Sequence, residues 1–322
     1  MTDPKVNITI PTYNRAHCLS KAIDAALKQS YTNFSVTVID DGSNDDTLRL
    51  VERYFAHPNF CYVKLDKNVG TARAKNVSMM LSDYDAITFH DSDDIPKENK
   101  ILMQARALSL KGHVADPILD WKLHGYEDGQ NLPIDVVVGA HEMIKLDGSV
   151  HTMAKTLSLV DDFFPNLQFP SKTEGDWILI NSGLFRKHVF EDLGGYLDSV
   201  EEDRELRNRT VGCGFMYYYL EQPLLTKIEM AASLTVDEDT GYKGQKRIDD
   251  RNEVRTRTRQ MLERFGDETL CAEMQVKVDL GDVGLAFVSN PDLLTFNETI
   301  PHTQATQESL TRSLDFARAV GD

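Results

Sequence analysis

Short apolar runs rich in β-branched residues alternate with amphipathic stretches over the first 110 residues of the chain. Runs of this kind predict buried strands, and apolar residues spaced three and four apart predict helices. The expected strands cover residues 6–10, 36–39, 61–65 and 85–89, and the expected helices cover 17–29, 47–55, 71–81 and 97–110. Strand–helix alternation implies right-handed crossovers, so we expect an α/β fold with a Rossmann-like, mostly parallel sheet flanked by helices.

The pattern changes after residue 111. Asp147-Gly148 lies between two apolar runs and predicts a hairpin. Further strands are expected at 136–138, 149–151, 177–180 and 216–220, a helix at 247–265, and a weakly structured tail after residue 290. We therefore divide the chain into one domain at 1–230, with a nucleotide-binding half (1–110) and an acceptor half (111–230), and a C-terminal extension at 231–322 that is helical with a weakly structured tail.

Composition narrows the class of protein. The chain has 322 residues, 41% hydrophobic and 27% charged, which is typical of a globular protein. No apolar run approaches 18 residues, and the N-terminus lacks the basic-then-apolar pattern of a signal peptide, so we expect a cytoplasmic protein. Its four cysteines are scattered and fit reduced thiols. A net charge of −16 argues against a nucleic-acid partner.

Three carboxylates follow the strand expected at 85–89: Asp91, Asp93 and Asp94. Carboxylates this close repel one another and lose hydration unless a positive charge is near. Mg²⁺ and Mn²⁺ prefer carboxylate oxygen and leave positions open for phosphate oxygens, so the pattern indicates a metal site. The alternative is a solvated acidic turn in which Asp94 caps the next helix, with Pro96 at an early helical position.

Two more polar clusters, 11–15 and 40–43, follow expected strands, and in parallel sheets ligands bind beyond these strand ends. Asp40 and Asp41 are suited to accept hydrogen bonds from a nucleobase or ribose, whereas the alternative is a glycine turn with a helix cap. Arg73 or Lys75, in a third junction at 68–76, would lie over a base or phosphates, or else be exposed cations at a helix start. No Walker or GxGxxG motif is present.

These clusters come in a recognisable order: Ile8-Thr9-Ile10-Pro11-Thr12-Tyr13-Asn14-Arg15, Val38-Ile39-Asp40-Asp41-Gly42-Ser43, Asn68-Val69-Gly70 with Lys75-Asn76, and Phe89-His90-Asp91-Ser92-Asp93-Asp94. In this order and spacing the chain resembles the family 2 inverting glycosyltransferases of the GT-A fold. A later stretch, Gly194-Gly195-Tyr196 followed by Glu202-Asp203-Arg204-Glu205-Leu206, resembles the family segment that carries the general base. The resemblance covers residues 5–230.

The resemblance implies a role for each matching residue. Asp203 would be the general base, and Asp91 and Asp93 would be the metal ligands of a DxD pair, with Mn²⁺ or Mg²⁺ as the ion. Asp93 would lie closest to the metal and Asp91 nearer the ribose. The residues expected to contact the nucleotide sugar are Pro11, Thr12, Tyr13, Arg15, Asp40, Asp41, Asn68, Gly70, Arg73, Lys75, Asp91 and Ser92. Acidic residues at 201–203 also suit a solvated helix start, which is the alternative for the base.

Two positions depart from the family pattern. Lys75 stands where many relatives have arginine, so the charge is kept without the planar fork. The segment 227–233 contains no histidine where relatives often have one, which puts that contact to metal or phosphate in doubt. His90 precedes the acidic cluster and is interpreted as a packing residue rather than a ligand.

A basic segment at 243–264 stands out in this acidic chain. It is interpreted either as a surface for a lipid-phosphate acceptor or the inner face of a membrane, with peripheral contact, or as a partner of the acidic body of the protein. Pairing with the acidic body is slightly favoured.

The expected function is metal-dependent, inverting transfer of a sugar from a nucleotide sugar, with UDP as the expected nucleotide, to a glycan or glycolipid hydroxyl. The alternatives are a sugar nucleotidyltransferase of related fold, whose glycine-rich signature does not match 11–15, and a nucleotide-sugar-binding module without turnover.

Overall fold

A computed structural model describes residues 3–111, 129–153, 180–229, 241 and 244–321. The strands are β1 (Val6–Thr12), β2 (Phe34–Asp40), β3 (Phe60–Leu65), β4 (Ala86–Phe89), β5 (Ile95–Pro96), β6 (Val136–Ile144), β7 (Val150–Met153), β8 (Leu184–Arg186), β9 (Tyr217–Ile228) and β10 (Leu285–Val288). The α-helices are α1 (Leu19–Leu27), α2 (Thr47–Val51), α3 (Thr71–Leu81), α4 (Lys100–Leu108), α5 (Lys187–Leu193), α6 (Glu202–Gly212), α7 (Gln245–Glu263), α8 (Leu270–Glu273) and α9 (Gln304–Gly321). Short 3₁₀ helices are η1 (Glu52–Tyr54), η2 (Ile180–Ser182) and η3 (Pro291–Leu293).

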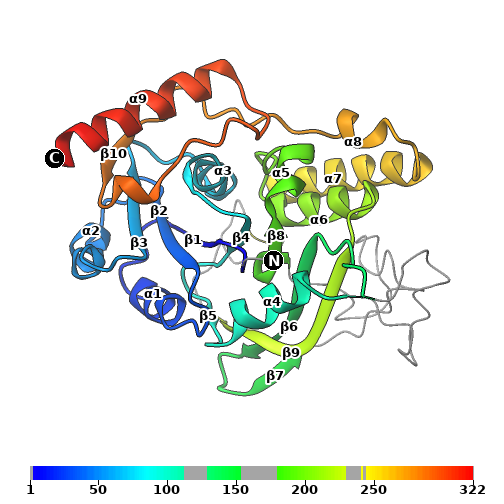
Figure 1. Ribbon diagram of the computed structural model, residues 1–322, viewed down its shortest axis with the longest axis horizontal. Coiled ribbons are helices and arrows are strands. Elements are labelled where there is room, and N and C mark those ends of the chain that lie inside the picture. The colour runs from blue at the N-terminus through cyan, green and yellow to red at the C-terminus, as the bar shows by residue number, and fades with distance from the viewer. Residues whose placement is uncertain (1–2, 112–128, 154–179, 230–240, 242–243, 322) are drawn as a thin grey trace.

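A single mixed sheet runs through the described residues in the order β10-β3-β2-β1-β4-β8-β6-β9-β5, with β7 paired to β6 (Figure 1). The strands β3, β2, β1 and β4 are parallel, so their carboxyl ends meet at one edge of the sheet. The predicted fold class, a mostly parallel sheet flanked by helices, is confirmed. The predicted Asp-Gly hairpin is also present, as the antiparallel pair β6–β7.

Apolar side chains cover both faces of the sheet, which is why β1 and β2 are buried along their whole length. One face packs against a cluster that includes Val77 and Met80 of α3, Phe190 of α5 and Leu310 of α9. The opposite face packs against α1 and α4. With helices on both faces, ligands can reach the sheet only at its strand ends.

One prediction of local structure is wrong. Pro96 does not begin a helix, because it pairs with Leu225 in the short strand β5, and α4 starts four residues later behind Asn99. Asp94 is therefore not a helix cap. The strand expected at 177–180 lies largely outside the described residues, and its last residue, Ile180, begins η2.

The prediction of a weakly structured tail after residue 290 is also wrong, because the tail forms η3 and the 18-residue helix α9. Leu310 and Leu314 of α9 are buried against the sheet. Before α9, the side-chain amide of Asn297 donates hydrogen bonds to the carbonyls of Met79 (2.5 Å) and Ser82 (2.7 Å) at the end of α3. The C-terminal extension thus belongs to the same core as the N-terminal half, and β10 extends its sheet beside β3 (Figure 1).

The backbone at Gly194 and Gly195, in the segment predicted to carry the general base, requires glycine at both positions. Gly194 has φ of +74° and ψ of −157°, a region that other residues rarely adopt. A Cβ added there would lie 1.8 Å from the carbonyl oxygen of Val276. A Cβ on Gly195 would lie 2.6 Å from Oδ1 of Asn76. Both glycines therefore allow close backbone contact just before α6.

We predict that Gly194→Ala lowers the free energy of unfolding by about 3 kcal/mol, since backbone strain and overpacking each cost about 1–3 kcal/mol. Gly214→Ala is the matched control, because Gly214 also has positive φ (+85°) but open space around its Cβ position. It should lose about 1 kcal/mol from strain alone. Urea denaturation measures both, and equal losses in the two variants would contradict the role of the contact with Val276.

Candidate active site

Hydrogen bonds hold together the loops that follow β1 and β2. The backbone N–H of Asp41 donates to the carbonyl of Thr12 (2.9 Å), and that of Asn14 donates to Oγ of Ser43 (2.9 Å). The N–H of Asn44 donates in turn to Oδ1 of Asn14 (2.9 Å). Asn14 takes a left-handed φ of +52°, which asparagine tolerates better than most residues. The first two predicted clusters therefore form one rigid rim.

Asp40 and Asp41 are both buried and have different partners. Asp40 accepts from the backbone N–H of Ser43 (2.7 Å) and from the Tyr62 hydroxyl. Asp41 accepts from the N–H groups of Val69 (2.7 Å) and Gly70 (2.9 Å), which ties the β3–α3 loop to the same rim. Burial raises the pKa of Asp41 to about 6, against the effect of these two hydrogen bonds. In this arrangement Asp40 faces the protein interior.

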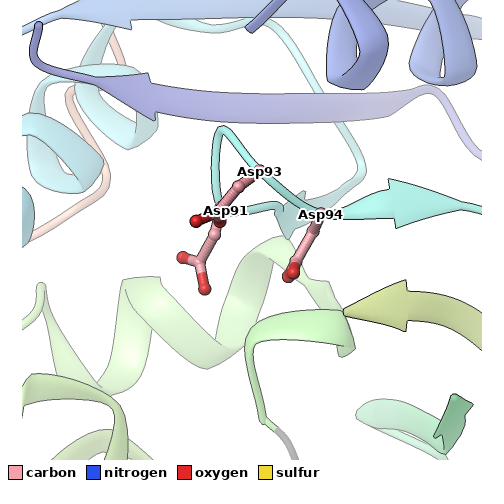
Figure 2. Close-up of side chains that lie close together, drawn as sticks. All are labelled: Asp91, Asp93 and Asp94. Atoms are coloured by element: carbon pink, nitrogen blue, oxygen red, sulfur yellow. The ribbon is translucent and has the colours of Figure 1, made fainter. Parts of the chain in front are cut away.

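The acidic cluster lies in the turn between β4 and β5 (Figure 2). Carboxylate oxygens of Asp91, Asp93 and Asp94 lie within 4.8 Å of one another. Burial and the negative charge of Asp91 raise the pKa of Asp93. Three convergent carboxylates fit a hard divalent ion, which accepts oxygen ligands at such spacing. Asp94, which the sequence motif does not assign to the metal, completes the cluster.

A lysine from a distant strand reaches this cluster. Nζ of Lys227, on β9, lies 3.0 Å from Oδ2 of Asp91 and 3.2 Å from Oδ2 of Asp94. Burial opposes the charged form of Lys227, but Asp94 and Asp91 outweigh it and raise the pKa of the lysine. The carboxylates are thus partly neutralised by the protein itself.

The candidate base Asp203 lies in the first turn of α6 and contacts the buried Lys75 of α3. Nζ of Lys75 is 2.6 Å from Oδ1 of Asp203 and 3.2 Å from Oε1 of Glu202, and it lies over the Tyr196 ring at 4.8 Å. Burial works against the ammonium, but the charges of Asp203 and Glu202 hold the pKa of Lys75 well above its usual value. The positive charge of Lys75 also acts on Asp91, whose pKa is lowered despite burial by Lys227 and then Lys75. The charge of Lys75 therefore acts on both the candidate base and the acidic cluster.

Asn76, the neighbour of Lys75, fixes the segment before α6. Its side-chain amide donates to the Tyr196 carbonyl (3.0 Å) and accepts from the Tyr196 N–H (2.8 Å). Arg209 of α6, fully buried, donates to the carbonyls of Leu193 and Gly195 (both 2.6 Å). These bonds set the position of α6, which carries the candidate base, relative to α3.

The remaining predicted residues line the same strand-end region with differing exposure. Tyr13 and Asn68 are exposed, whereas Pro11, Thr12 and Ser92 are buried. Arg73 forms an ion pair with Asp198 (3.1 Å), in the segment before α6. Arg15 lies in the β1–α1 loop, partly buried, and its positive charge acts on Asp93.

The basic helix α7 packs beside α6 (Figure 1). The buried carboxylate of Glu201 pairs with Arg247 (3.1 Å) and Arg251 (3.0 Å) of α7, and Glu205 lies 3.5 Å from Arg257. These contacts support pairing with the acidic body rather than a surface for an acceptor or membrane. In the part of the chain that the structure describes, no helix is both long and apolar enough to cross a membrane.

The sequence placed Asp94 in the acidic cluster, but the motif assigned only Asp91 and Asp93 to the metal, and it did not identify Lys227 or Glu202 as parts of the site. Asp94 and Glu202 are next to predicted residues in the sequence, but the sequence does not show which way their side chains point. For Lys227 the available pattern was a lysine following Leu224, Leu225 and Thr226 in a strand, where a charged side chain needs a partner. Sequence distance conceals that partner, which lies more than a hundred residues earlier.

Comparisons with known proteins agree with this arrangement. The family model described as "Glycosyl transferase family 2" matches residues 7–162. The Escherichia coli protein named UDP-Glc:alpha-D-GlcNAc-diphosphoundecaprenol beta-1,3-glucosyltransferase WfgD is 35% identical over 115 residues, which are 36% of this chain and 45% of the relative. Staphylococcus aureus TarS, a poly(ribitol-phosphate) beta-N-acetylglucosaminyltransferase, is 31% identical over 118 residues, 36% of this chain and 20% of the relative.

The fold is shared with a solved structure of TarS residues 1–349 in complex with UDP-GlcNAc, which matches with a TM-score of 0.57 and 16% identity over 98% of this chain and 88% of that one. The structure is therefore of the GT-A type. Residues 7–162 match the model of glycosyl transferase family 2, and over this segment the resemblance seen in the motifs is confirmed. The matched segments span less than half the length of these sequence relatives.

We predict that Lys75→Met lowers the free energy of unfolding by about 3 kcal/mol near pH 8, because it leaves Asp203 and Glu202 unpaired in a largely buried place. The deficit relative to wild type should shrink toward pH 5. Burial and the charge of Asp203 raise the pKa of Glu202, and Lys75 opposes this rise, so the pKa of Glu202 rises further without the cation. Protonation of Glu202 at low pH then removes unpaired charge.

Lys5→Met is the matched control, because Lys5 pairs with Asp83 at 2.7 Å on the surface. It should cost less than about 1 kcal/mol at either pH. Thermal and urea denaturation at pH 5 and pH 8 measure the loss of stability of each variant, relative to wild type, at each pH. A Lys75→Met deficit that is the same at both pH values would contradict the pairing with ionised carboxylates.

Proposed function

We propose that the chain is an inverting glycosyltransferase that moves a sugar from a nucleotide sugar to a hydroxyl group of a glycan or glycolipid. The observation that carries the proposal is that one cation, the ammonium of Lys75, interacts with both the candidate base and the acidic cluster. Lys75 contacts Asp203 at 2.6 Å, and its charge lowers the pKa of Asp91. Catalysis by single displacement needs the base and the leaving-group site at one place, and this arrangement supports it.

UDP is the proposed nucleotide. The rim formed by the loops after β1 and β2, with the β3–α3 loop tied to it through Asp41, offers backbone and side-chain groups at the strand ends. The names of two similar proteins support the choice, since one is a UDP-Glc-dependent glucosyltransferase and the other has been solved with UDP-GlcNAc. Tyr13, which is exposed, is proposed to border the base of the donor.

Asp203 is the proposed general base. Lys75 donates to its Oδ1, which fixes the carboxylate and leaves Oδ2 to accept the proton of the acceptor hydroxyl. The side chain is 28% exposed, so an acceptor can reach it, whereas Lys75 behind it is only 1% exposed. Attack from the side of Asp203, opposite the departing diphosphate, inverts the configuration at the sugar carbon.

Asp91 and Asp93, with Asp94 beside them, are proposed to hold Mn²⁺ or Mg²⁺. Such an ion would neutralise the charge that grows on the departing diphosphate. The protein holds the three carboxylates together in the short β4–β5 turn, where the backbone N–H of Asp94 donates to the carbonyl of Asp91 (3.0 Å). The proposal includes no membrane contact, because arginines of α7 are engaged by α6.

We predict that Asp203→Asn lowers turnover by about 10²-fold or more, the usual scale for a lost general base, with nearly unchanged affinity for UDP. Asp198→Asn is the control, because Asp198 lies five residues earlier and pairs with Arg73 rather than Lys75. Turnover of UDP-sugars on glycan acceptors and calorimetry with UDP give the two readings. NMR of the product should show an anomer opposite to the donor, and retained configuration would refute the single displacement.

We predict that Asp93→Asn removes the metal dependence of UDP binding while the melting temperature stays within a few degrees of wild type, since the residue lies at the rim of the sheet. Calorimetry of UDP with and without Mn²⁺ is the measurement. Asp46→Asn, at a surface position 72% exposed, is the control and should behave as wild type. Undiminished metal-dependent binding in Asp93→Asn would rule out this ligand. A protein that binds UDP-sugars without any turnover would be a binding module instead.

A further inference from the structure

Lys227 holds two of the three carboxylates that would bind the metal. Its Nζ lies 3.0 Å from Asp91 and 3.2 Å from Asp94, and its side chain is 20% exposed. The strand β9 fixes the position of the Lys227 backbone, because Lys227 is in register with Met143 of β6 near the end of both strands. The lysine is thus directed into the acidic cluster by the sheet and not by a mobile surface segment.

An ammonium and a divalent cation compete for the same carboxylate oxygens. Asp91 and Asp94 each use Oδ2 toward Lys227, and Asp91 and Asp94 are both members of the three-carboxylate group. A bound ion at this group would repel the ammonium at close range, and the ammonium would have to leave the oxygens that the ion takes. A displaced lysine at this depth then needs another anion, because a buried unpaired charge is costly.

We propose that Lys227 is a built-in competitor of the divalent ion, so that the ion binds well only together with a donor diphosphate that receives the displaced ammonium. This inference rests on the proposed function for the identity of the anion. Lys227 thereby becomes a donor-contacting residue, and metal and nucleotide bind with positive coupling. Coupling of this kind is reciprocal and typically amounts to about 5- to 150-fold in affinity.

The simpler alternative is a structural ion pair in which Lys227 only joins β9 to the β4–β5 turn. The two accounts differ in what happens when the ammonium is removed. For a competitor, the empty carboxylates bind the ion more tightly. For a structural pair, the turn loosens and the ion binds no better or more weakly.

The experiment is calorimetric titration of MnCl₂ and MgCl₂ into the full chain, first without nucleotide and then with saturating UDP. Lys227→Met is compared with wild type and with Lys97→Met. Lys97 is the matched control, because it is bound to β9 by its backbone N–H (2.9 Å to the carbonyl of Leu224) but pairs with Glu142 at 2.6 Å instead of the acidic cluster. The variant Lys97→Met therefore removes one positive charge from the same end of the sheet as Lys227→Met does.

Without nucleotide, Lys227→Met should bind Mn²⁺ about tenfold more tightly than wild type, and Lys97→Met should stay within about twofold. UDP should tighten Mn²⁺ binding by wild type more than by Lys227→Met. Equal or weaker Mn²⁺ binding by Lys227→Met in the absence of UDP would overturn the proposal. If no protein binds UDP, the proposed function fails, but the titrations with metal alone still decide whether Lys227 competes.

A second measurement uses the wild-type protein and does not require a folded variant. An amine-modifying reagent followed by mass spectrometry reports the reactivity of Lys227 with and without Mg²⁺. A competitor should become more reactive when Mg²⁺ displaces it from Asp91 and Asp94, with Lys97 as the internal reference. Unchanged or reduced labelling of Lys227 at a Mg²⁺ concentration that calorimetry shows to be saturating would overturn the proposal.

Discussion

The ammonium of Lys75 contacts Asp203 and Glu202 inside the protein, and the geometry of the candidate site depends on this interaction. A buried lysine needs anionic partners, and these come from the helix α6, which starts 127 residues later in the chain. The pair therefore ties the N-terminal half of the chain to the helix that carries the candidate base. Asn76 reinforces the same connection through its two hydrogen bonds to the Tyr196 backbone.

The rest of α6 is held by a second set of charges. Glu201 accepts Arg247 and Arg251 from α7, and Glu205 accepts Arg209 within its own helix. In this way the C-terminal extension restrains the helix that carries the candidate base. The extension also supports α3 through Asn297, so both partners of the Lys75 contact are braced by it.

The same balance of buried charge appears at the acidic cluster. Asp91 and Asp94 are paired with Lys227, whereas Asp93 is raised in pKa by burial and by Asp91. A site assembled from carboxylates alone would repel itself, and a lysine from β9 relieves that repulsion in the protein without an ion. The proposed metal site and the stability of the turn thus depend on the same carboxylates.

The sequence by itself determined the local elements and the chemistry at the strand ends. The apolar runs predicted β1 to β4, and α3 begins and ends at the residues expected from its pattern, because these elements are dictated by nearby residues and by burial on both faces of a sheet. The motifs likewise placed Asp91, Asp93 and Asp203 as candidates. The local pattern was misleading at Pro96, where pairing with Leu225 overrode a helix-start pattern. It was also insufficient at α9, where two buried leucines in a polar segment were too few to indicate a helix.

Only the tertiary structure decided which charges meet. From the sequence, one interpretation of Lys75 is an exposed cation at a helix start, yet its side chain is buried against Asp203. Lys227 lies outside the strand expected at 216–220, yet it partly neutralises the acidic turn. The physical reason is that a charge is stabilised by whatever lies within a few ångströms of it, and the folding of strands β4 and β9 and helices α3 and α6 sets those distances. Residue type and spacing identify candidate groups, whereas packing determines their partners.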